Sequence, residues 1–175
     1  MAGASRETAY TSRMTYFYKK VPSPVGLLTL VAGDRGLAAV LWENDDPKRV
    51  RLGPLAEKPD HPTLREAERQ LDGYFAGHLE EFSVPLDFTG TEFQKEVWRA
   101  LTAIPFGETR SYAQIAAQIG RPRAVRAVGA AIGRNPISII VPCHRVIGAN
   151  GDLTGFAGGL EVKAFLLKLE KQPGR

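Results

Sequence analysis

Near residue 89 the chain changes from a mixture of predicted strands and one helix to mostly helical spacing, and this change limits the possible architecture more than any other feature of the chain. Before it, three short segments rich in β-branched and aromatic residues are separated by turn residues and predict strands. These segments are 15–19, 26–32 and 37–42. After it, apolar residues recur at helical spacing. The chain is therefore predicted to be α+β, with an N-terminal α/β domain over 14–88 and a mostly helical domain over 89–175.

The N-terminal domain is predicted to contain a small antiparallel sheet and one helix. Residues 33–36, Gly-Asp-Arg-Gly, predict a hairpin turn, and the charged, proline-containing segment 43–60 predicts a loop. Apolar residues at helical spacing begin at Pro62, and Gly77 is a plausible helix end. Residues 82–88 fit either a strand or an extended linker.

Helix start signals are frequent in the second domain. Thr91, with Gln94 three residues later, forms a capping-box pattern, and Ser111 is a good N-cap for a second helix. A third helix, rich in alanine and valine, is predicted over 123–132. Two short helices joined by a tight turn, the second flanked by arginines, are typical of a helix-turn-helix, although simple helical hairpins share this pattern.

Two segments follow the predicted helix-turn-helix. The first, 136–147, is rich in β-branched residues and predicts a buried extended segment. The second, 160–170, predicts a last helix. The only cysteine of the chain lies within the first of them.

Charge is distributed unevenly along the chain, whose formal net charge is +4. Residues 43–90 carry 6 basic and 11 acidic side chains, whereas residues 91–145 carry 8 basic and 3 acidic ones. The basic block favours contact with a polyanion such as nucleic acid, while an unevenly charged solvated face would look the same. No apolar run approaches the roughly 20 residues of a membrane-spanning helix. Residues 1–13, predicted to be a flexible tail, lack a secretory signal pattern, so a cytoplasmic location is expected.

Cys143 poses the central question, because its role is either structural or chemical. A single thiol excludes an internal disulfide and a zinc site built on paired cysteines. An isolated intracellular cysteine most often packs as a small buried hydrophobe. Here Pro142 precedes it, and His144 and Arg145 follow it. Such neighbours favour the reactive thiolate, so the residues alone leave both roles open.

The segment around this cysteine, 140–147 (Ile-Val-Pro-Cys-His-Arg-Val-Ile), closely resembles the active-site signature of the methylated-DNA–protein-cysteine methyltransferases, the 6-O-alkylguanine-DNA alkyltransferases. Other landmarks of that family occur in the expected order. They are Phe93-Gln94, Val97-Trp98, Ile104-Pro105-Phe106-Gly107, Ser111-Tyr112, Arg126-Ala127-Val128-Gly129, Asn135-Pro136 and Gly158-Gly159. The resemblance is strong over 90–170 and looser over 15–88.

The resemblance implies a DNA repair protein that acts once. In this family the cysteine takes the alkyl group from the 6-oxygen of guanine in double-stranded DNA, after the nucleotide has been flipped out of the stack. The thioether product is not reversed, and neither a cofactor nor a metal is expected. Transfer from 4-O-alkylthymine and cooperative self-association on DNA stay open, and no obligate protein partner or membrane contact is expected.

The same resemblance implies a catalytic set of four residues. Cys143 is the alkyl acceptor, His144 is the base that activates it through a water, and Glu170 orients the imidazole. Asn135 matches the asparagine that links the helix-turn-helix to the active-site segment. Without the resemblance, Glu170 would be interpreted as an exposed carboxylate at a helix end and Asn135 as a helix C-cap.

The second helix of the helix-turn-helix is implied to enter the minor groove. Arg126 resembles the arginine that takes the place of the extruded nucleotide, and Tyr112 resembles the tyrosine that presses on its 3′ phosphate. The small residues that allow close approach to the groove are Ala124, Ala127, Gly129 and Ala130. A solvated arginine and a core tyrosine are the plainer interpretations of Arg126 and Tyr112.

The base pocket is also implied by the resemblance. Its residues are Pro142, Val146, Phe156, Ala157 and Gly158. Phe156 stands where most members have tyrosine, and Ala157 where some have serine. Ile132 replaces an asparagine frequent in bacterial members, and Val125 replaces a small alanine. These departures are expected to change pocket fit and rate and to leave the type of reaction unchanged.

Two other functions compete with alkyl transfer. Binding-only relatives of this family flag alkylated guanine for another repair pathway, but they carry a non-nucleophilic residue, usually tryptophan, at the position of Cys143. A transcriptional regulator would use the helix-turn-helix alone, usually as a dimer. The sequence shows no dimerisation element, so alkyl transfer is the favoured function.

Overall fold

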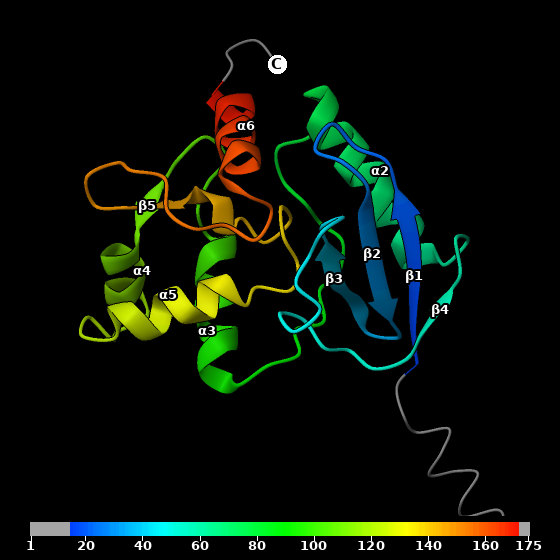
Figure 1. The fold of residues 1–175 in the computed structure, drawn as a ribbon, viewed down its shortest axis with the longest axis horizontal. Helices are drawn as coiled ribbons and strands as arrows, with labels where there is room; N and C mark the ends of the chain where they lie inside the picture. The colour runs from blue at the N-terminus through cyan, green and yellow to red at the C-terminus, as the bar shows by residue number, and fades with distance from the viewer. Residues whose placement is uncertain (1–14, 172–175) are drawn as a thin grey trace, which may run out of the picture.

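The computed structural model describes residues 15–171, so the tail predicted over 1–13 lies outside the described part. A small sheet with one helix forms one unit, and a group of helices forms the other (Figure 1). One continuous core of buried apolar residues joins the two units. The α+β prediction is therefore confirmed. No helix within this range is both long and apolar enough to cross a membrane.

The N-terminal unit is built on a four-stranded sheet with the order β3-β2-β1-β4. Its three longer strands are β1 (Tyr16–Val21), β2 (Leu28–Gly33) and β3 (Gly36–Leu41). They pair antiparallel, and the predicted hairpin closes at the pair formed by Gly33 and Gly36. Gly36 has a φ of +147°, and a Cβ there would lie 2.6 Å from the carbonyl oxygen of Pro85. Only glycine fits this close approach.

The predicted loop over 43–60 contains a fourth strand that the sequence did not predict, β4 (Leu55–Glu57). It pairs in parallel with β1, so the sheet is mixed and not purely antiparallel. All three residues of β4 are exposed, so the strand lacks the alternation by which strands are recognised in a sequence. Residues 82–88, predicted to be either a strand or an extended linker, form the extended linker, with one isolated bridge from Leu86 to Leu37.

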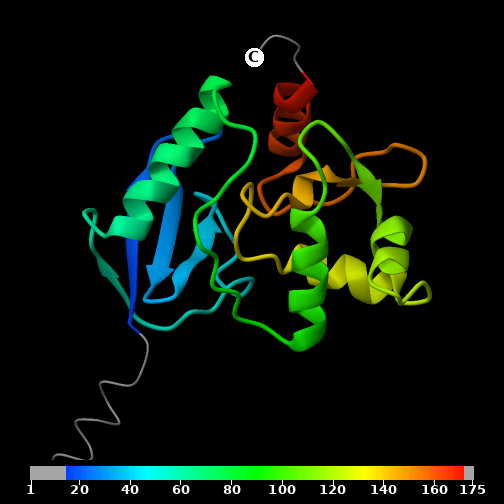
Figure 2. The same ribbon diagram turned by 180° about the vertical axis from the view of Figure 1, so that it is seen from behind.

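Helix α2 (Pro62–Ala76) lies across one face of the sheet, as the helical spacing predicts (Figure 2). Pro62 is in the first turn, where its missing N–H is not needed. Gly77 ends the helix with a left-handed φ of 83°. The buried face includes Leu64, Leu71 and Tyr74, which pack into the core shared by the two units.

The C-terminal unit is mostly helical, as predicted. Its helices are α3 (Glu92–Thr102), α4 (Tyr112–Gln118), α5 (Val125–Gly133) and α6 (Leu160–Lys171). Capping boxes at Thr91 and Ser111 begin α3 and α4. The two-stranded parallel pair of β5 (Arg110–Ser111) and β6 (Val146–Ile147) joins the start of α4 to the segment that follows the cysteine.

The apolar run 136–147 is buried, as predicted, but most of it is a turn and not an extended segment. Ile139 has a φ of 71°, which is rare for a β-branched residue. The amide of Val141 donates to the carbonyl oxygen of Ile137 (2.9 Å) instead of to a neighbouring strand. The 3-10 helix η1 (Cys143–Arg145) follows. β-branched residues indicated burial correctly, but their composition does not distinguish a buried turn from a strand.

Candidate active site

Cys143 lies at the start of η1 and borders a small pocket between the two units. The residue is 7% exposed. One wall of the pocket is Arg49, from the segment after β3, and another is Ser138, from the buried turn. The loop before α6 contributes Phe156 and Ala157, and the end of α5 closes the pocket. The only thiol of the chain is therefore inside the protein, next to a cavity of about 20 Å³ that has room for about one water molecule.

Three of the predicted pocket residues lie outside this pocket. Pro142 lines a separate groove together with Phe106. Val146 is fully buried in β6. Gly158 packs against the indole ring of Trp42. These residues shape the surroundings of the pocket without lining it.

Asn135 holds the turn that precedes Cys143. Its Nδ2 donates to the carbonyl oxygen of Val141 (2.9 Å), and its Oδ1 accepts from the amide of Ile137 (3.0 Å). Helix α5 ends with Arg134 as its C-cap, so the interpretation of Asn135 as the C-cap is wrong. A buried amide with both ends satisfied keeps irregular backbone in one conformation. Asn135 thus connects the end of α5 to the cysteine segment.

His144 and Glu170 form a buried pair next to the cysteine. Nε2 of His144 lies 2.6 Å from Oε2 of Glu170, and both side chains are 1% exposed or less. The interpretation of Glu170 as an exposed helix-end carboxylate is therefore wrong. Arg145 binds the same carboxylate, with Nε donating to Oε1 (2.8 Å) and Nη2 to Oε2 (3.1 Å). One carboxylate therefore joins α6 to η1.

Burial and the hydrogen bonds of the shared carboxylate act in opposite directions on the pKa values of this cluster. Burial raises the pKa of Glu170, but the hydrogen bond from His144 and the hydrogen bonds and positive charge of Arg145 outweigh burial and lower the pKa to about 2. Burial lowers the pKa of His144, against the opposing hydrogen bond with Glu170, so the imidazole is neutral at pH 7. A neutral ring that donates from Nε2 has its acceptor at Nδ1. This Nδ1 is buried and makes no hydrogen bond to any residue in 15–171.

Burial also raises the pKa of the Cys143 thiol. The hydrogen bond with Asn135 and the positive charges of Arg49 and Lys163 oppose that shift without overcoming it. The thiol is therefore protonated at neutral pH. Because the thiolate is the reactive form, nucleophilic chemistry at this site requires a base that removes the proton.

Tyr74 joins the cluster from the N-terminal unit, which the sequence did not predict. Its hydroxyl donates to Oε2 of Glu170 (2.5 Å), the same oxygen that meets Nε2 of His144. Its buried ring packs edge-on against Phe106. In the sequence Tyr74 is one of several apolar positions on a helix face. Nothing in that spacing indicates a polar contact with a residue 96 positions away.

Two cations near the thiol were also not predicted. Lys163 is 1% exposed, and its Nζ donates to the carbonyl oxygen of Val146 (2.7 Å). Arg49 donates through Nε to Asp45 (2.7 Å) and through Nη1 to the backbone carbonyl of Asn135. Basic residues in an amphipathic helix and in a charged loop ordinarily face solvent. Their inward positions depend on contacts between segments that are distant in the sequence.

The small-residue face of α5 is accessible. Arg126, Ala127 and Ala130 are exposed, and Ala124 and Gly129 are half-buried. Tyr112, at the start of α4, is half-buried against Gly129 and is not a fully buried core residue. Its hydroxyl pairs with the hydroxyl of Thr154 in the loop before α6. Three of the predicted DNA-contacting residues are thus exposed on α5, and Tyr112, which lies against Gly129, is connected to the pocket loop.

Trp42 supports the pocket loop from the end of the sheet. Its ring meets that of Phe156 edge-on, with centroids 5.5 Å apart, and its Nε1 donates to the hydroxyl of Ser138 (3.1 Å). A Cβ on Gly158 would lie 2.8 Å from the indole. The ring of Phe156 is thus held in the pocket by a contact from the other unit.

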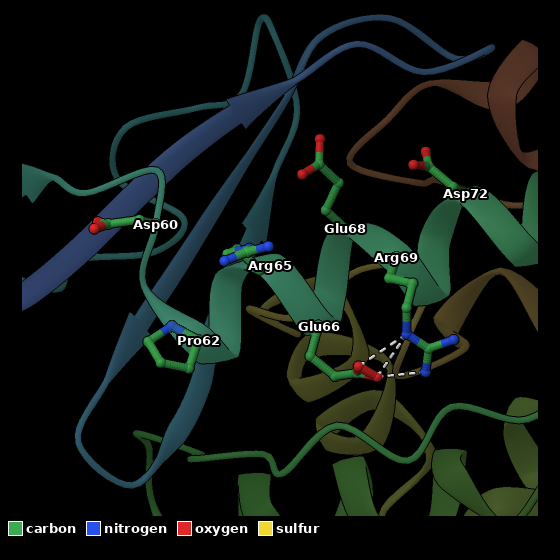
Figure 3. A pocket seen from close by; sticks show the side chains of 7 residues that line it. All are labelled: Asp60, Pro62, Arg65, Glu66, Glu68, Arg69 and Asp72. Carbon is green, nitrogen blue, oxygen red and sulfur yellow. Dashed lines mark hydrogen bonds and ion pairs between the residues drawn. The ribbon is translucent and has the colours of Figure 1, made fainter.

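A second hollow lies along α2 and has a different character (Figure 3). Its walls are charged, and Arg69 donates from Nε to the carboxylate of Glu66 (2.9 Å). None of the predicted site residues lines it. Over the described range 15–171, no group of three or more His, Cys, Asp or Glu side chains is arranged to hold a metal ion.

Both parts of the chain match models of one family. Residues 16–88 match the ribonuclease-like domain of 6-O-methylguanine DNA methyltransferase, and residues 92–172 match its DNA binding domain. The methylated-DNA–protein-cysteine methyltransferase of Methanosarcina acetivorans is 53% identical over 154 residues, which cover 88% of this chain and 97% of the relative. That of Mycolicibacterium paratuberculosis is 53% identical over 155 residues, which cover 89% of this chain and 92% of the relative.

The solved structures agree with these matches. The crystal structure of Mycobacterium tuberculosis OGT in complex with DNA has a TM-score of 0.80 and 50% identity, covering 90% of this chain and 92% of that one. The fold and the site together define an enzyme of DNA-alkylation repair. The chain belongs to the methylated-DNA–protein-cysteine methyltransferase family, as the resemblance of its motifs implied.

Proposed function

We propose that this protein takes the alkyl group from the 6-oxygen of guanine in double-stranded DNA and keeps it on Sγ of Cys143. The supporting observation is the arrangement of three side chains. Cys143 borders a pocket, and the adjacent His144 is held through Nε2 by Glu170 while its Nδ1 has no hydrogen-bond partner in 15–171. A nucleophile, a base and a group that orients the base are the elements of an activated thiol.

The proposed reaction is a proton transfer followed by a displacement at the alkyl carbon. Nδ1 of His144 accepts the thiol proton through a water, and the thiolate attacks the alkyl carbon in line. The S–C bond forms as the C–O bond to guanine breaks, and the electron pair of that bond stays on the base. Guanine then takes one proton and is restored. The thioether has no acid–base route back to a thiol, so each chain acts once.

Access to the 6-oxygen requires extrusion of the nucleotide from the duplex. We assign entry into the minor groove to α5, whose exposed Ala127 and Ala130 permit close approach. Arg126 occupies the space left in the stack, and Tyr112 presses on the neighbouring phosphate. The pairing of Tyr112 with Thr154 connects this contact to the pocket loop.

The decisive experiment is intact mass spectrometry after incubation with a duplex that contains 6-O-methylguanine. We expect a gain of one methyl group per chain, localised to the peptide with Cys143, and no further gain when more duplex is added. A parallel duplex with 4-O-methylthymine tests the second base. Tight binding to the 6-O-methylguanine duplex without any adduct would instead establish the binding-only function.

We expect Gly158→Ala to slow the transfer at least tenfold. The new methyl group overlaps the indole of Trp42, and overpacking of this kind costs about 1–3 kcal/mol. Relief requires movement of the loop that carries Phe156, and about 1 Å of misplacement at a reacting site costs up to about 100-fold in rate. Single-turnover rates measure the effect. The double variant with Trp42→Phe should recover part of the rate, and an unchanged rate in Gly158→Ala would contradict a positioning role for the indole.

We expect Tyr74→Phe to move the acid limb of the pH–rate profile to higher pH, by up to about one unit for a hydrogen bond to a charged group. Without this donor, Glu170 attracts the Nε2 proton of His144 more strongly, so the pKa of His144 rises. The base is then protonated at a higher pH. Tyr16→Phe is the control, because Tyr16 belongs to a separate apolar cluster. Superimposable profiles for Tyr74→Phe and the unmodified protein would exclude this coupling.

A further inference from the structure

A groove between the two units carries positive charge that the proposed reaction does not use. Lys48, Arg49 and Arg51 line it from the segment after β3, and Arg134 lines it from the end of α5. No acidic residue contributes to its walls. The hollow on α2 differs, because acidic side chains line it together with its arginines (Figure 3).

Three of these cations have no carboxylate partner. Lys48, Arg51 and Arg134 are exposed, and none of them forms an ion pair within residues 15–171. The nearby acids are already engaged: Asp45 pairs with Arg49, and Asp46 accepts from the backbone amide of Lys48. Cations gathered in a concave surface without counter-charges attract an anionic ligand.

The groove is continuous with the surface assigned to DNA. Arg134 is the C-cap of α5, and its Nη1 donates to the carbonyl oxygen of Lys48 (3.1 Å). Arg126 and Arg134 lie about 12 Å apart along the helix axis at 1.5 Å per residue. Arg49 lines both this groove and the pocket of Cys143. The groove therefore begins at the end of α5 and shares Arg49 as a wall with the pocket of Cys143.

We propose that this groove binds backbone phosphates of the strand whose nucleotide enters the Cys143 pocket, so that the N-terminal unit takes part in DNA binding. The inference rests on the proposed function, because a nucleotide in that pocket keeps its flanking phosphates at the pocket entrance. Lysine and arginine recognise phosphate without base specificity. This suits a protein that must act at any sequence.

The test is the salt dependence of binding to a duplex with 6-O-methylguanine, measured in a Cys143→Ala background so that transfer does not intervene. The slope of log K against log salt is negative, and each lost phosphate contact reduces its magnitude by about 0.9 in B-DNA. We expect the double variant Lys48→Gln/Arg51→Gln to reduce the magnitude of this slope by about 1 to 2 and to weaken binding about tenfold at low salt. The matched control is Arg65→Gln/Arg69→Gln on α2, which removes the same charge and should leave the slope unchanged.

Equal slopes for the groove variant and its parent, or an equal loss in the α2 control, would overturn the proposal. A second measurement uses the free base 6-O-benzylguanine, which has no phosphate, with Cys143 present. Its rate of transfer should be unaffected by Lys48→Gln/Arg51→Gln, and a parallel loss would show that the groove residues act on the pocket and not on DNA. Failure of the unsubstituted protein to form any adduct would refute the proposed function, while the salt slopes would still report on the groove.

Discussion

Cys143→Ala is expected to bind a duplex with 6-O-methylguanine and to transfer no methyl group. The proposed product is a thioether at Sγ, and alanine has no atom that forms that bond. The pocket walls come from other residues, including Arg49 and Phe156. The proposed DNA surface is formed by residues of α4 and α5, and Cys143 itself belongs to η1. Intact mass spectrometry and a gel-shift assay on the same samples measure the two properties separately.

Cys143→Ser is the matched variant, because it keeps a nucleophilic atom in nearly the same place. A hydroxyl is far harder to deprotonate than a thiol, so the neutral imidazole of His144 does not activate it to a comparable extent. We expect transfer at background level in both variants. A methyl gain by Cys143→Ala would place the acceptor elsewhere in the chain and contradict the assignment of Cys143, and a gain by Cys143→Ser at the normal rate would show that activation of the thiol is not required.

Glu170→Gln is expected to lower the free energy of unfolding by about 3–5 kcal/mol, the usual cost of breaking a buried ion pair. The substitution leaves the guanidinium of Arg145 buried without its counter-charge. An amide that turns its NH₂ toward Nε2 of His144 also meets a donor instead of an acceptor. Transfer should fall in parallel, because the base loses its orientation. Chemical unfolding at pH 7 measures the stability, and Glu161→Gln, exposed on the same helix, is the control.

The same carboxylate sets an acid limit on stability. The pKa of Glu170 is about 2 in the folded protein, below its ordinary value of 4.5. A lowered pKa stabilises the fold fully above the unfolded value and loses that contribution as pH falls from 4.5 toward 2. The shift corresponds to about 3 kcal/mol. Unfolding curves of the unsubstituted protein and Glu170→Gln should converge over this window, and a constant difference would contradict the shifted pKa.

Local signals predicted most of the elements correctly. Thr91 and Ser111 begin helices because a side-chain oxygen satisfies nearby amides, an interaction complete within four residues. The hairpin turn and the end of α2 at Gly77 are equally local. The strand β4 was not predicted, because it forms through backbone pairing with β1. Its side chains are all exposed, so they show no alternation of apolar and polar residues.

In the active site, too, the sequence motif identified residues correctly, whereas contacts between distant segments were not predicted. The resemblance of its residues assigned Cys143, His144 and Glu170 to one site, and the structure brings the imidazole and the carboxylate within hydrogen-bond distance. Two of the plainer interpretations were wrong for one reason. Glu170 and Asn135 each stand near the end of a helix, where an exposed carboxylate and a C-cap are common, but tertiary packing buries both side chains.

By itself, the sequence determined the fold class, the helix starts and the family motif around one thiol, because these depend on residues close together in the chain. Only the tertiary structure decided what surrounds that thiol. Tyr74, Arg49 and Trp42 come from the N-terminal unit, and each meets its partner through contacts between residues 86 to 96 positions apart. Such contacts depend on how the two units pack, which no local pattern records. The N-terminal unit therefore supports the site as well as the fold.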